Sequence, residues 1–197
     1  PLLPGEVITS VIPTEAKAEG SYLVMVTKKG IIKRTPLNRY ANVKKTGLIA
    51  INLDEGDDLA WTMVTHGNDY IIVATKNGQA IRFSENDVRV VGRTARGVKA
   101  IELNGDDEVV GMGIAKSGTK ILTVTEDGKG RITSADEYRI QFRGGMGVKN
   151  FDVDKYGKVC GVGVVNDDDD IIIISMNGII IRMKANEINQ QSRYAGG

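Results

Sequence analysis

The chain has 197 residues, of which 41% are hydrophobic and 26% are charged, so it is long enough to bury a sizeable core. No run of about 18 apolar residues marks a membrane span, and the N-terminus lacks the basic and apolar regions of a signal peptide. The single Cys160 excludes an internal disulfide and fits a reducing compartment, whereas the net charge of +1 says nothing by itself about partners.

Two series of glycines recur along the chain at a spacing close to 50 residues. They are Gly30, Gly78, Gly128 and Gly178, and Gly47, Gly97, Gly147 and Gly197. Such self-similarity indicates one supersecondary unit copied in tandem. The copies cover about residues 7–58, 59–108, 109–158 and 159–197, and we expect them to form a single repeat domain.

Each copy predicts short strands in the same order. A first strand is expected at 7–12, 59–64, 109–114 and 159–164, and a second at 22–26, 70–74, 121–124 and 171–174. A third strand follows, as at 179–182, and a fourth is expected at 48–53, 98–103 and 148–153. The run 171–174 is apolar throughout, which predicts a strand covered on both faces.

A glycine-containing dipeptide follows each second strand. The four dipeptides are Lys29-Gly30, Asn77-Gly78, Asp127-Gly128 and Asn177-Gly178. Asn-Gly and Asp-Gly favour hairpins with type I′ turns, in which both central residues have positive φ. Three or four short strands per repeat, without a helical period, predict an all-β, propeller-like array of about four blades.

The charge follows the repeat. The segments 30–49, 78–99, 128–149 and 178–197 hold 18 of the 26 Lys and Arg residues but 5 of the 25 Asp and Glu residues. In a radial array, equivalent segments form one belt, and a basic belt is an electrostatic track for a polyanion. Charged turns that keep a β-protein soluble are the alternative, but they predict mixed signs in every loop.

The residues of this basic belt are our candidates for contact with the DNA backbone. Lysine and arginine on phosphates position the duplex without reading its bases. The candidates are Lys33, Arg34, Arg39, Lys44, Lys45, Arg82, Arg89, Arg93, Arg96, Lys99, Lys129, Arg131, Arg139, Arg143, Lys149, Arg182, Lys184 and Arg193.

Two of these segments resemble a known family. Residues 138–148 read Tyr-Arg-Ile-Gln-Phe-Arg-Gly-Gly-Met-Gly-Val, and residues 88–101 likewise combine arginines with a Gly-Val pair. They are similar to the blade repeats in the C-terminal domain of bacterial DNA gyrase A proteins, and in the related C-terminal domain of topoisomerase IV. The resemblance covers essentially the whole chain.

The signature of that family is the box Gln-Arg-Arg-Gly-Gly-Lys-Gly. Gln141, Arg143, Gly144, Gly145 and Gly147 match it, while Phe142 and Met146 replace one of its two arginines and its lysine. Since the family's box belongs to the first blade, we expect this to be a degenerate later copy. An intact box would then precede Pro1 in a larger domain.

The resemblance implies a β-pinwheel, a propeller-like disc whose blades exchange a strand and whose basic rim bends duplex DNA. It implies that the domain functions within a bacterial, cytoplasmic and nucleoid-associated A2B2 enzyme, which introduces negative supercoils. ATP, Mg²⁺ and the catalytic residues would act in other domains, so we expect no cofactor, metal or catalytic residue here, and no membrane partner.

Two other interpretations remain open, a C-terminal domain of topoisomerase IV and a propeller that serves as a protein-interaction platform. An enzyme site in the propeller centre has no supporting constellation of residues. The acidic run 167–170 could hold a cation or form a solvated turn. We expect Cys160 to be a buried, inert thiol and Trp61 to lie in the core.

Overall fold

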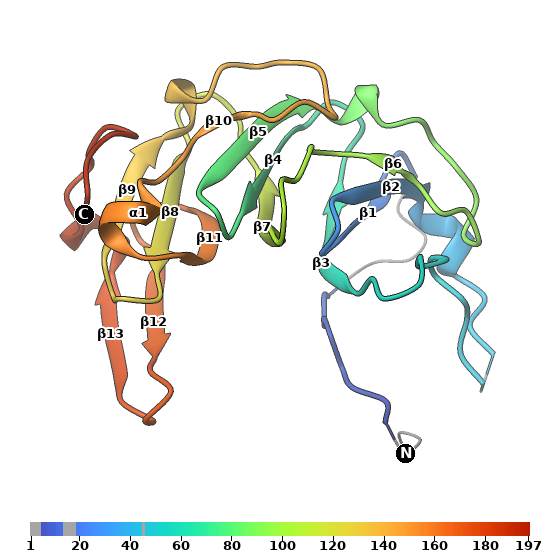
Figure 1. Ribbon diagram of the computed structural model, residues 1–197. Helices are drawn as coiled ribbons and strands as arrows, with labels where there is room; N and C mark the ends of the chain where they lie inside the picture. The colour runs from blue at the N-terminus through green and yellow to red at the C-terminus, as the bar shows by residue number, and fades with distance from the viewer. Residues whose placement is uncertain (1–4, 14–18, 45) are drawn as a thin grey trace.

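A computed structural model describes residues 5–13, 19–44 and 46–197. Their strands form antiparallel sheets that stand side by side in an open arch (Figure 1). The first sheet has the order β3 (Leu59–Thr65), β1 (Tyr22–Thr27), β2 (Ile31–Pro36) and β6 (Val98–Lys99). The second has the order β10 (Val148–Lys149), β5 (Gln79–Ser84), β4 (Tyr70–Thr75) and β7 (Val109–Ile114).

The other end of the arch carries two smaller sheets. The third sheet has the order β11 (Val159–Val165), β8 (Lys120–Thr125) and β9 (Gly130–Ser134), and the fourth pairs β12 (Asp170–Ile174) with β13 (Ile180–Lys184). Short 3-10 turns follow the second strand of each hairpin. They are η1 (Leu37–Tyr40), η2 (Glu85–Asp87), η3 (Ala135–Glu137) and η4 (Ala185–Glu187). The all-β fold predicted from the repeat is confirmed.

The hairpin turns differ from the predicted type I′ turns. Positive φ occurs in the described residues at glycines alone, as at Gly30 with φ of +78°. The Gly30 amide donates to the Thr27 carbonyl at 3.0 Å, and the Ile31 amide donates to Thr27 Oγ1 at 3.1 Å. Each hairpin therefore has a three-residue loop that ends in a left-handed glycine. The sequence signal for this turn is the Thr or Ser three residues before each glycine: Thr27, Thr75, Thr125 and Ser175.

Neighbouring repeats exchange strands. β3 follows the first hairpin by more than twenty residues and pairs with β1, and β7 and β11 pair in the same way with β4 and β8. β6 and β10 return to the preceding sheet, where Val98 lies opposite Ile32 and Val148 lies opposite Ala80. The strands predicted at 59–64, 109–114 and 159–164 thus belong to the sheet of the preceding hairpin.

Several predicted strands are shorter or missing. No strand forms at 7–12 or 48–53, and the strands predicted at 98–103 and 148–153 are reduced to two residues each. The exchange pattern gives the reason. Segments 98–99 and 148–149 pair with the hairpin of the preceding repeat, whereas no described hairpin precedes β1 to pair with 7–12 or 48–53. A single helical turn, α1 (Val153–Tyr156), replaces the end of the last predicted strand.

The core lies between adjacent sheets. Val24, Ile71 and Phe83 are buried between the first and second sheets, and Tyr138 and Phe151 between the second and third. In the fourth sheet, however, Ile172 and Ile174 are exposed, so the prediction that 171–174 is covered on both faces is wrong. A two-stranded sheet at the end of the array has a neighbour on one side alone.

Two side chains expected in the interior lie at the surface. Cys160 is exposed on β11, and Trp61 is 42% exposed on β3. Both strands lie at the edge of their sheets, and alternate residues of an edge strand face outward. The prediction that Cys160 is buried, which rested on the apolar residues around it, is therefore wrong.

Candidate nucleic-acid interface

Four of the predicted DNA contacts are buried. Lys33, Arg34, Arg82 and Arg131 lie in the third-strand positions β2, β5 and β9, and each is at most 6% exposed. Their charged groups bind to the protein itself. We assign them a structural role and leave them out of the candidate interface.

Lys33 and Arg131 occupy the same repeat position and anchor the loop of the following repeat. Lys33 Nζ donates to the carbonyls of Ala50 and Arg93. Arg131 donates to the carbonyls of Asn150, Arg193 and Ala195, the last at 2.7 Å. Burial, with a smaller contribution from the Arg93 charge, lowers the pKa of Lys33 to about 8. Burial also lowers the pKa of Arg131.

Arg82 holds the next repeat in a similar way. Its Nη1 donates to the carbonyl of Ala135 at 2.8 Å and lies 3.5 Å from the Asp136 carboxylate. Its guanidinium also stands 5.6 Å from the ring centroid of Tyr70. The side chain therefore joins the second sheet to the 3-10 turn η3 of the third.

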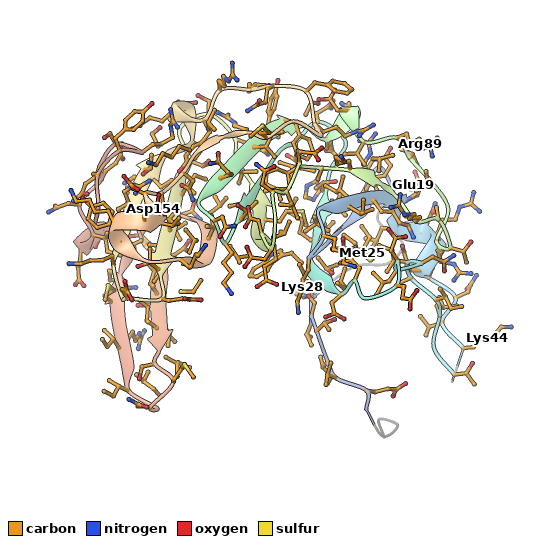
Figure 2. The ribbon with its side chains drawn as sticks, in the orientation of Figure 1. Glu19, Met25, Lys28, Lys44, Arg89 and Asp154 are labelled. Carbon is orange, nitrogen blue, oxygen red and sulfur yellow. The ribbon has the colours of Figure 1, made fainter. Side chains whose placement is uncertain are left out.

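The outer loops present the accessible charge. The loops 88–97 and 138–147 run along the convex edge of the arch, where Figure 1 shows the chain passing from η2 to β6 and from η3 to β10. Arg89 and Arg139 stand at equivalent positions in these loops, are exposed, and form no ion pair with any other described residue. Arg89 lies on the outer side of the arch in Figure 2, whereas Lys28, in the hairpin between β1 and β2, lies on its inner side.

Several other exposed cations have acidic partners. Arg96 Nε donates to Asp54 at 2.6 Å, and Lys149 lies 3.2 Å from Asp152. Exposed pairs of this kind contribute little to stability, so a phosphate can replace the carboxylate at low cost. The exposed predicted residues are Arg39, Lys44, Arg89, Arg96, Lys99, Lys129, Arg139, Lys149, Arg182 and Lys184. Lys45 lies outside the described residues.

Arg93, Arg143 and Arg193 form a third group, half-buried at one repeat position. Each donates from Nη1 to the carbonyl of a residue 44 positions earlier, Ile49, Lys99 and Lys149. They fasten each outer loop to the segment that leaves the preceding repeat. A hollow of about 380 Å³ beside Arg93 is lined by Arg39, Pro36 and residues 90–94.

The residues of the degenerate box shape loop 138–147, which is the outer loop of the third repeat and is called the third outer loop below. The Gln141 amide donates to the Arg82 carbonyl at 2.9 Å, and the Gly144 amide to the Ala100 carbonyl at 2.6 Å. Gly144 and Gly147 have positive φ, and a Cβ at Gly147 would collide with the Ala80 carbonyl. Gly145 accepts from the Glu102 amide at 2.9 Å. The matching box residues therefore fix the path of the loop.

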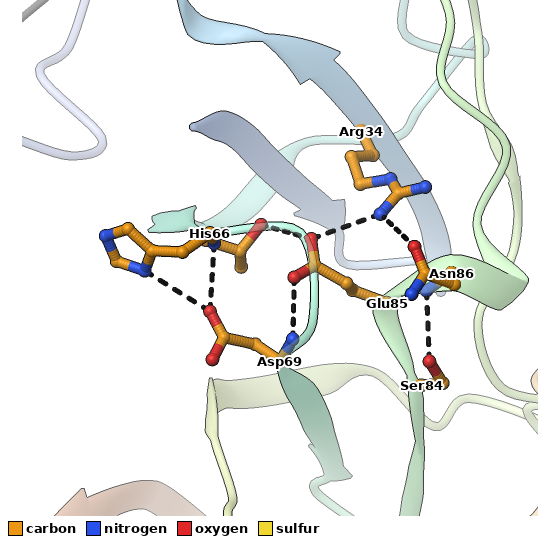
Figure 3. Close-up of polar contacts among 7 residues, drawn as sticks. Arg34, His66, Asp69, Ser84, Glu85 and Asn86 are labelled. Carbon is orange, nitrogen blue, oxygen red and sulfur yellow. Dashed lines mark hydrogen bonds and ion pairs between the residues drawn. The ribbon is translucent and has the colours of Figure 1, made fainter. Parts of the chain in front are cut away.

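A buried polar network joins the first two sheets (Figure 3). The Glu85 carboxylate accepts from Thr65 Oγ1 at 2.6 Å, from the Asp69 amide at 2.7 Å and from Arg34 Nη1 at 3.2 Å. Burial opposes the charge of Asp69, but hydrogen bonds from Lys116 and His66 hold its pKa below its ordinary value. The network has a structural explanation, and it borders the start of loop 88–97, where the Val91 amide donates to the Arg34 carbonyl at 3.0 Å.

The acidic run is engaged within the protein. Asp167 pairs with Lys120, Asp169 accepts from the Asn166 amide at 2.7 Å, and Asp170 lies 2.7 Å from Arg182. No group of three or more His, Cys, Asp or Glu side chains suited to a metal occurs in the described part of the chain. No helix in that part is long and apolar enough to cross a membrane.

Comparison with known families matches this chain to one described as the DNA gyrase C-terminal domain, beta-propeller, over residues 21–66, 69–116, 119–166 and 169–197. The chain belongs to the DNA gyrase C-terminal domain family. Each of the first three matched segments begins at a hairpin and ends just after the exchanged strand that pairs with it, which is β3, β7 or β11.

Curated relatives of this gyrase C-terminal domain are DNA gyrase A proteins. The one from Halalkalibacterium halodurans is 52% identical over 94 residues, which is 48% of this chain and 11% of that protein. The one from Clostridium acetobutylicum is 53% identical over 96 residues, 49% of this chain and 12% of that protein. The matched stretch is thus a small part of each relative.

Solved structures of both related enzymes share the fold of this gyrase C-terminal domain. A C-terminal domain of DNA topoisomerase IV superposes with a TM-score of 0.87 at 26% identity, covering 94% of this chain and 58% of that one. A DNA gyrase A C-terminal domain superposes with a TM-score of 0.80 at 26% identity, covering 89% of this chain and 59% of that one. The propeller-like pinwheel implied by the resemblance is therefore confirmed.

Proposed function

We propose that this domain binds duplex DNA along the convex edge of the arch and bends it without reading its sequence. The observation that carries the proposal is the repetition of an exposed, unpaired arginine at one loop position, Arg89 and Arg139. Lys99 and Lys149 follow at the end of each loop, also exposed. Cations at equivalent places on consecutive repeats suit a phosphate backbone that passes from one repeat to the next.

Bending needs several such contacts at once. Smooth bending of a short duplex costs on the order of 1–6 kcal/mol, which many phosphate contacts must offset. The outer loops are held by hydrogen bonds to the preceding repeat, such as the bond from Arg143 to the Lys99 carbonyl. The backbone that carries their cations is therefore held in place before DNA binds, which reduces the entropy lost on binding.

In the intact protein, we propose that the bent duplex supports the reaction of a DNA gyrase. The wrap would present a crossed segment for strand passage in an A2B2 enzyme, and ATP-driven cycles would introduce negative supercoils. Catalysis, ATP and Mg²⁺ would belong to other domains, and the enzyme would act on the chromosome in the bacterial cytoplasm.

A role in topoisomerase IV is a second candidate, favoured by the TM-score of 0.87 to such a domain. The topology of the bound DNA distinguishes a role in gyrase from a role in topoisomerase IV. Nicked circular DNA that is bound by this domain and then ligated should retain a change in linking number for a gyrase-type wrap. A simple bend without a crossing would leave the linking number unchanged.

The direct test of duplex binding uses the whole chain and an unmodified duplex of about 40 bp at several salt concentrations. We expect the affinity to fall with salt at a log–log slope of about −0.9 for each phosphate neutralised. The R89A/R139A variant should bind more weakly to unrelated sequences alike, with a slope smaller in magnitude by about 2. The matched control is K28A, which removes an exposed charge from the inner side and should bind as the wild type does.

Salt-independent affinity, or a loss confined to one DNA sequence, would contradict backbone recognition. Absence of duplex binding would instead favour a protein-interaction platform.

A further inference from the structure

The third outer loop combines its cations with large apolar side chains that face solvent. Phe142 is 68% exposed, Met146 56% and Ile140 54%. Arg139 is exposed in the same loop, and Arg143 follows Phe142. Exposed apolar groups gathered in one place mark a contact surface, and the adjacent positive charge suits an anionic partner.

The loop is rigidly supported, so this exposure does not come from a loose segment. Gln141 bonds through its amide to the Arg82 carbonyl at 2.9 Å, one residue before Phe142. Arg143 donates from Nε to the Asp87 carbonyl and from Nη1 to the Lys99 carbonyl, both at 2.8 Å. Its guanidinium also stands 5.6 Å from the Phe142 ring centroid. Phe142 is thus held between two fixed residues with its ring outside the fold.

The other repeats have no aromatic residue at the position of Phe142, although the fourth repeat exposes Tyr194 two residues beyond that position. The residues at the position of Phe142, five before the second glycine of each repeat, are Asn42, Gly92 and Ser192. The position of Met146 is taken by Arg96 in the second repeat and by Gly196 in the fourth. One loop in the array therefore carries an aromatic side chain at a place where its neighbours are small or polar.

We propose that Phe142, flanked by Ile140 and Met146, is a wedge that enters a base-pair step of the bound duplex and kinks it. The inference rests on the proposed duplex binding. Apolar side chains inserted between base pairs unstack them and kink the helix, while nearby cations hold the phosphates. Pyrimidine–purine steps unstack most easily, so the wedge favours a flexible step at the third loop. The remaining loops bend the duplex smoothly.

The wedge is tested with duplexes that carry 2-aminopurine, a base whose fluorescence rises when it unstacks. The label is moved along a bound duplex of about 40 bp that contains one TpA step at a defined position. Wild-type protein should raise the fluorescence at one step and bend the duplex more than a smooth wrap does. F142A should abolish the rise and lower the affinity about five- to tenfold, while the salt slope stays unchanged.

Two further variants separate the wedge from general effects. V90A removes an exposed apolar side chain from the second loop and should leave the fluorescence unchanged. G92F places an aromatic ring at the position equivalent to Phe142, where a Cβ meets nothing within 4 Å and φ is not positive. G92F should create a second unstacked step, one repeat away from the first.

The outcomes distinguish this inference from the proposed function. Wild-type protein that binds duplex with the expected salt slope but unstacks no base overturns the wedge and leaves duplex binding intact. An F142A variant that unstacks the base as the wild type does also overturns the wedge, because the unstacking would then come from another part of the protein. A wild-type protein that does not bind duplex DNA at all would contradict the proposed function.

Discussion

Arg143 donates a hydrogen bond from Nη1 to the backbone carbonyl of Lys99 at 2.8 Å. Its Nε donates to the carbonyl of Asp87, also at 2.8 Å. A residue that charge patterning assigned to DNA contact is therefore part of the scaffold that positions the exposed cations of the outer loops. The same bond recurs at Arg93 and Arg193, so it is a feature of the repeat.

We expect R143A to destabilise the domain by about 1–3 kcal/mol, because both carbonyls lose a charged donor. R143K should recover little, since an ammonium cannot reproduce the two directions of the guanidinium. R139A removes an exposed charge from the same loop and should leave the free energy of unfolding unchanged. Urea unfolding of the three variants measures the difference. Equal stability of R143A and R139A would contradict the structural role.

A second prediction concerns the close approach of the outer loop to the preceding sheet. Gly97 has φ of +109°, and a Cβ there would lie 2.5 Å from the Ile32 carbonyl oxygen. G97A should cost about 2–4 kcal/mol, the sum of left-handed strain and overpacking. G92A lies in the same loop, in open space and without positive φ, and should leave stability unchanged or slightly higher. Thermal unfolding compares the pair, and similar melting temperatures would exclude the steric explanation.

The sequence predicted the number of repeats and the hairpins, because both depend on local signals. Apolar runs and left-handed glycines such as Gly30 recur in the sequence at a regular spacing. The strands at 7–12 and 48–53 were overpredicted because a strand needs a partner, and the partner here belongs to a neighbouring repeat. Strand exchange entered through the family resemblance, since periodicity alone does not assign a strand to a sheet.

Charge patterning located the outer loops, but it did not separate the exposed cations of these loops from the buried cations that hold the scaffold together. Lys33 and Arg131 count as positive charge like Arg89, although they are buried in strands. A signal was available: Lys33 follows two isoleucines directly after a hairpin glycine, whereas Arg89 lies beyond the 3-10 turn. A cation inside a strand covered on both faces must use its donors on carbonyls of the protein.

A third prediction tests the buried pair between Arg34 and Glu85, whose Nη1 and Oε2 atoms lie 3.2 Å apart. E85A leaves the Arg34 charge without its buried carboxylate and should cost about 3–5 kcal/mol. In the next repeat the equivalent residue is Ala135, and Arg82 there binds the Ala135 carbonyl and the Asp136 carboxylate instead.

Adding N86D to E85A places a carboxylate at the position of Asp136, so the double variant should recover part of the lost stability. Urea unfolding of both variants against the wild type is the measurement. A double variant that is as unstable as E85A would show that the two repeats do not hold their arginines by interchangeable arrangements.

The last prediction concerns pH. Burial and the Arg93 charge hold the pKa of Lys33 at about 8, below its ordinary value of 10.5. Between these values the unfolded chain binds more protons at this residue than the folded one, so the free energy of unfolding rises with pH. Below pH 8 the lysine is charged in both states, and the full cost of burying that charge remains. Above it, the neutral amine still donates to the Ala50 and Arg93 carbonyls.

K33M should remove this rise, because methionine is of similar length and does not titrate. The measurement is chemical unfolding of wild type and K33M between pH 7 and about 9.5, below the range in which most lysines and tyrosines titrate. The difference in unfolding free energy, wild type minus K33M, should increase across this window. A difference that stays flat would mean that Lys33 keeps its ordinary pKa in the fold, and that its charge is solvated rather than buried against the outer loop. Because Arg131 occupies the same repeat position with a guanidinium that stays charged, the third repeat should contribute no such rise.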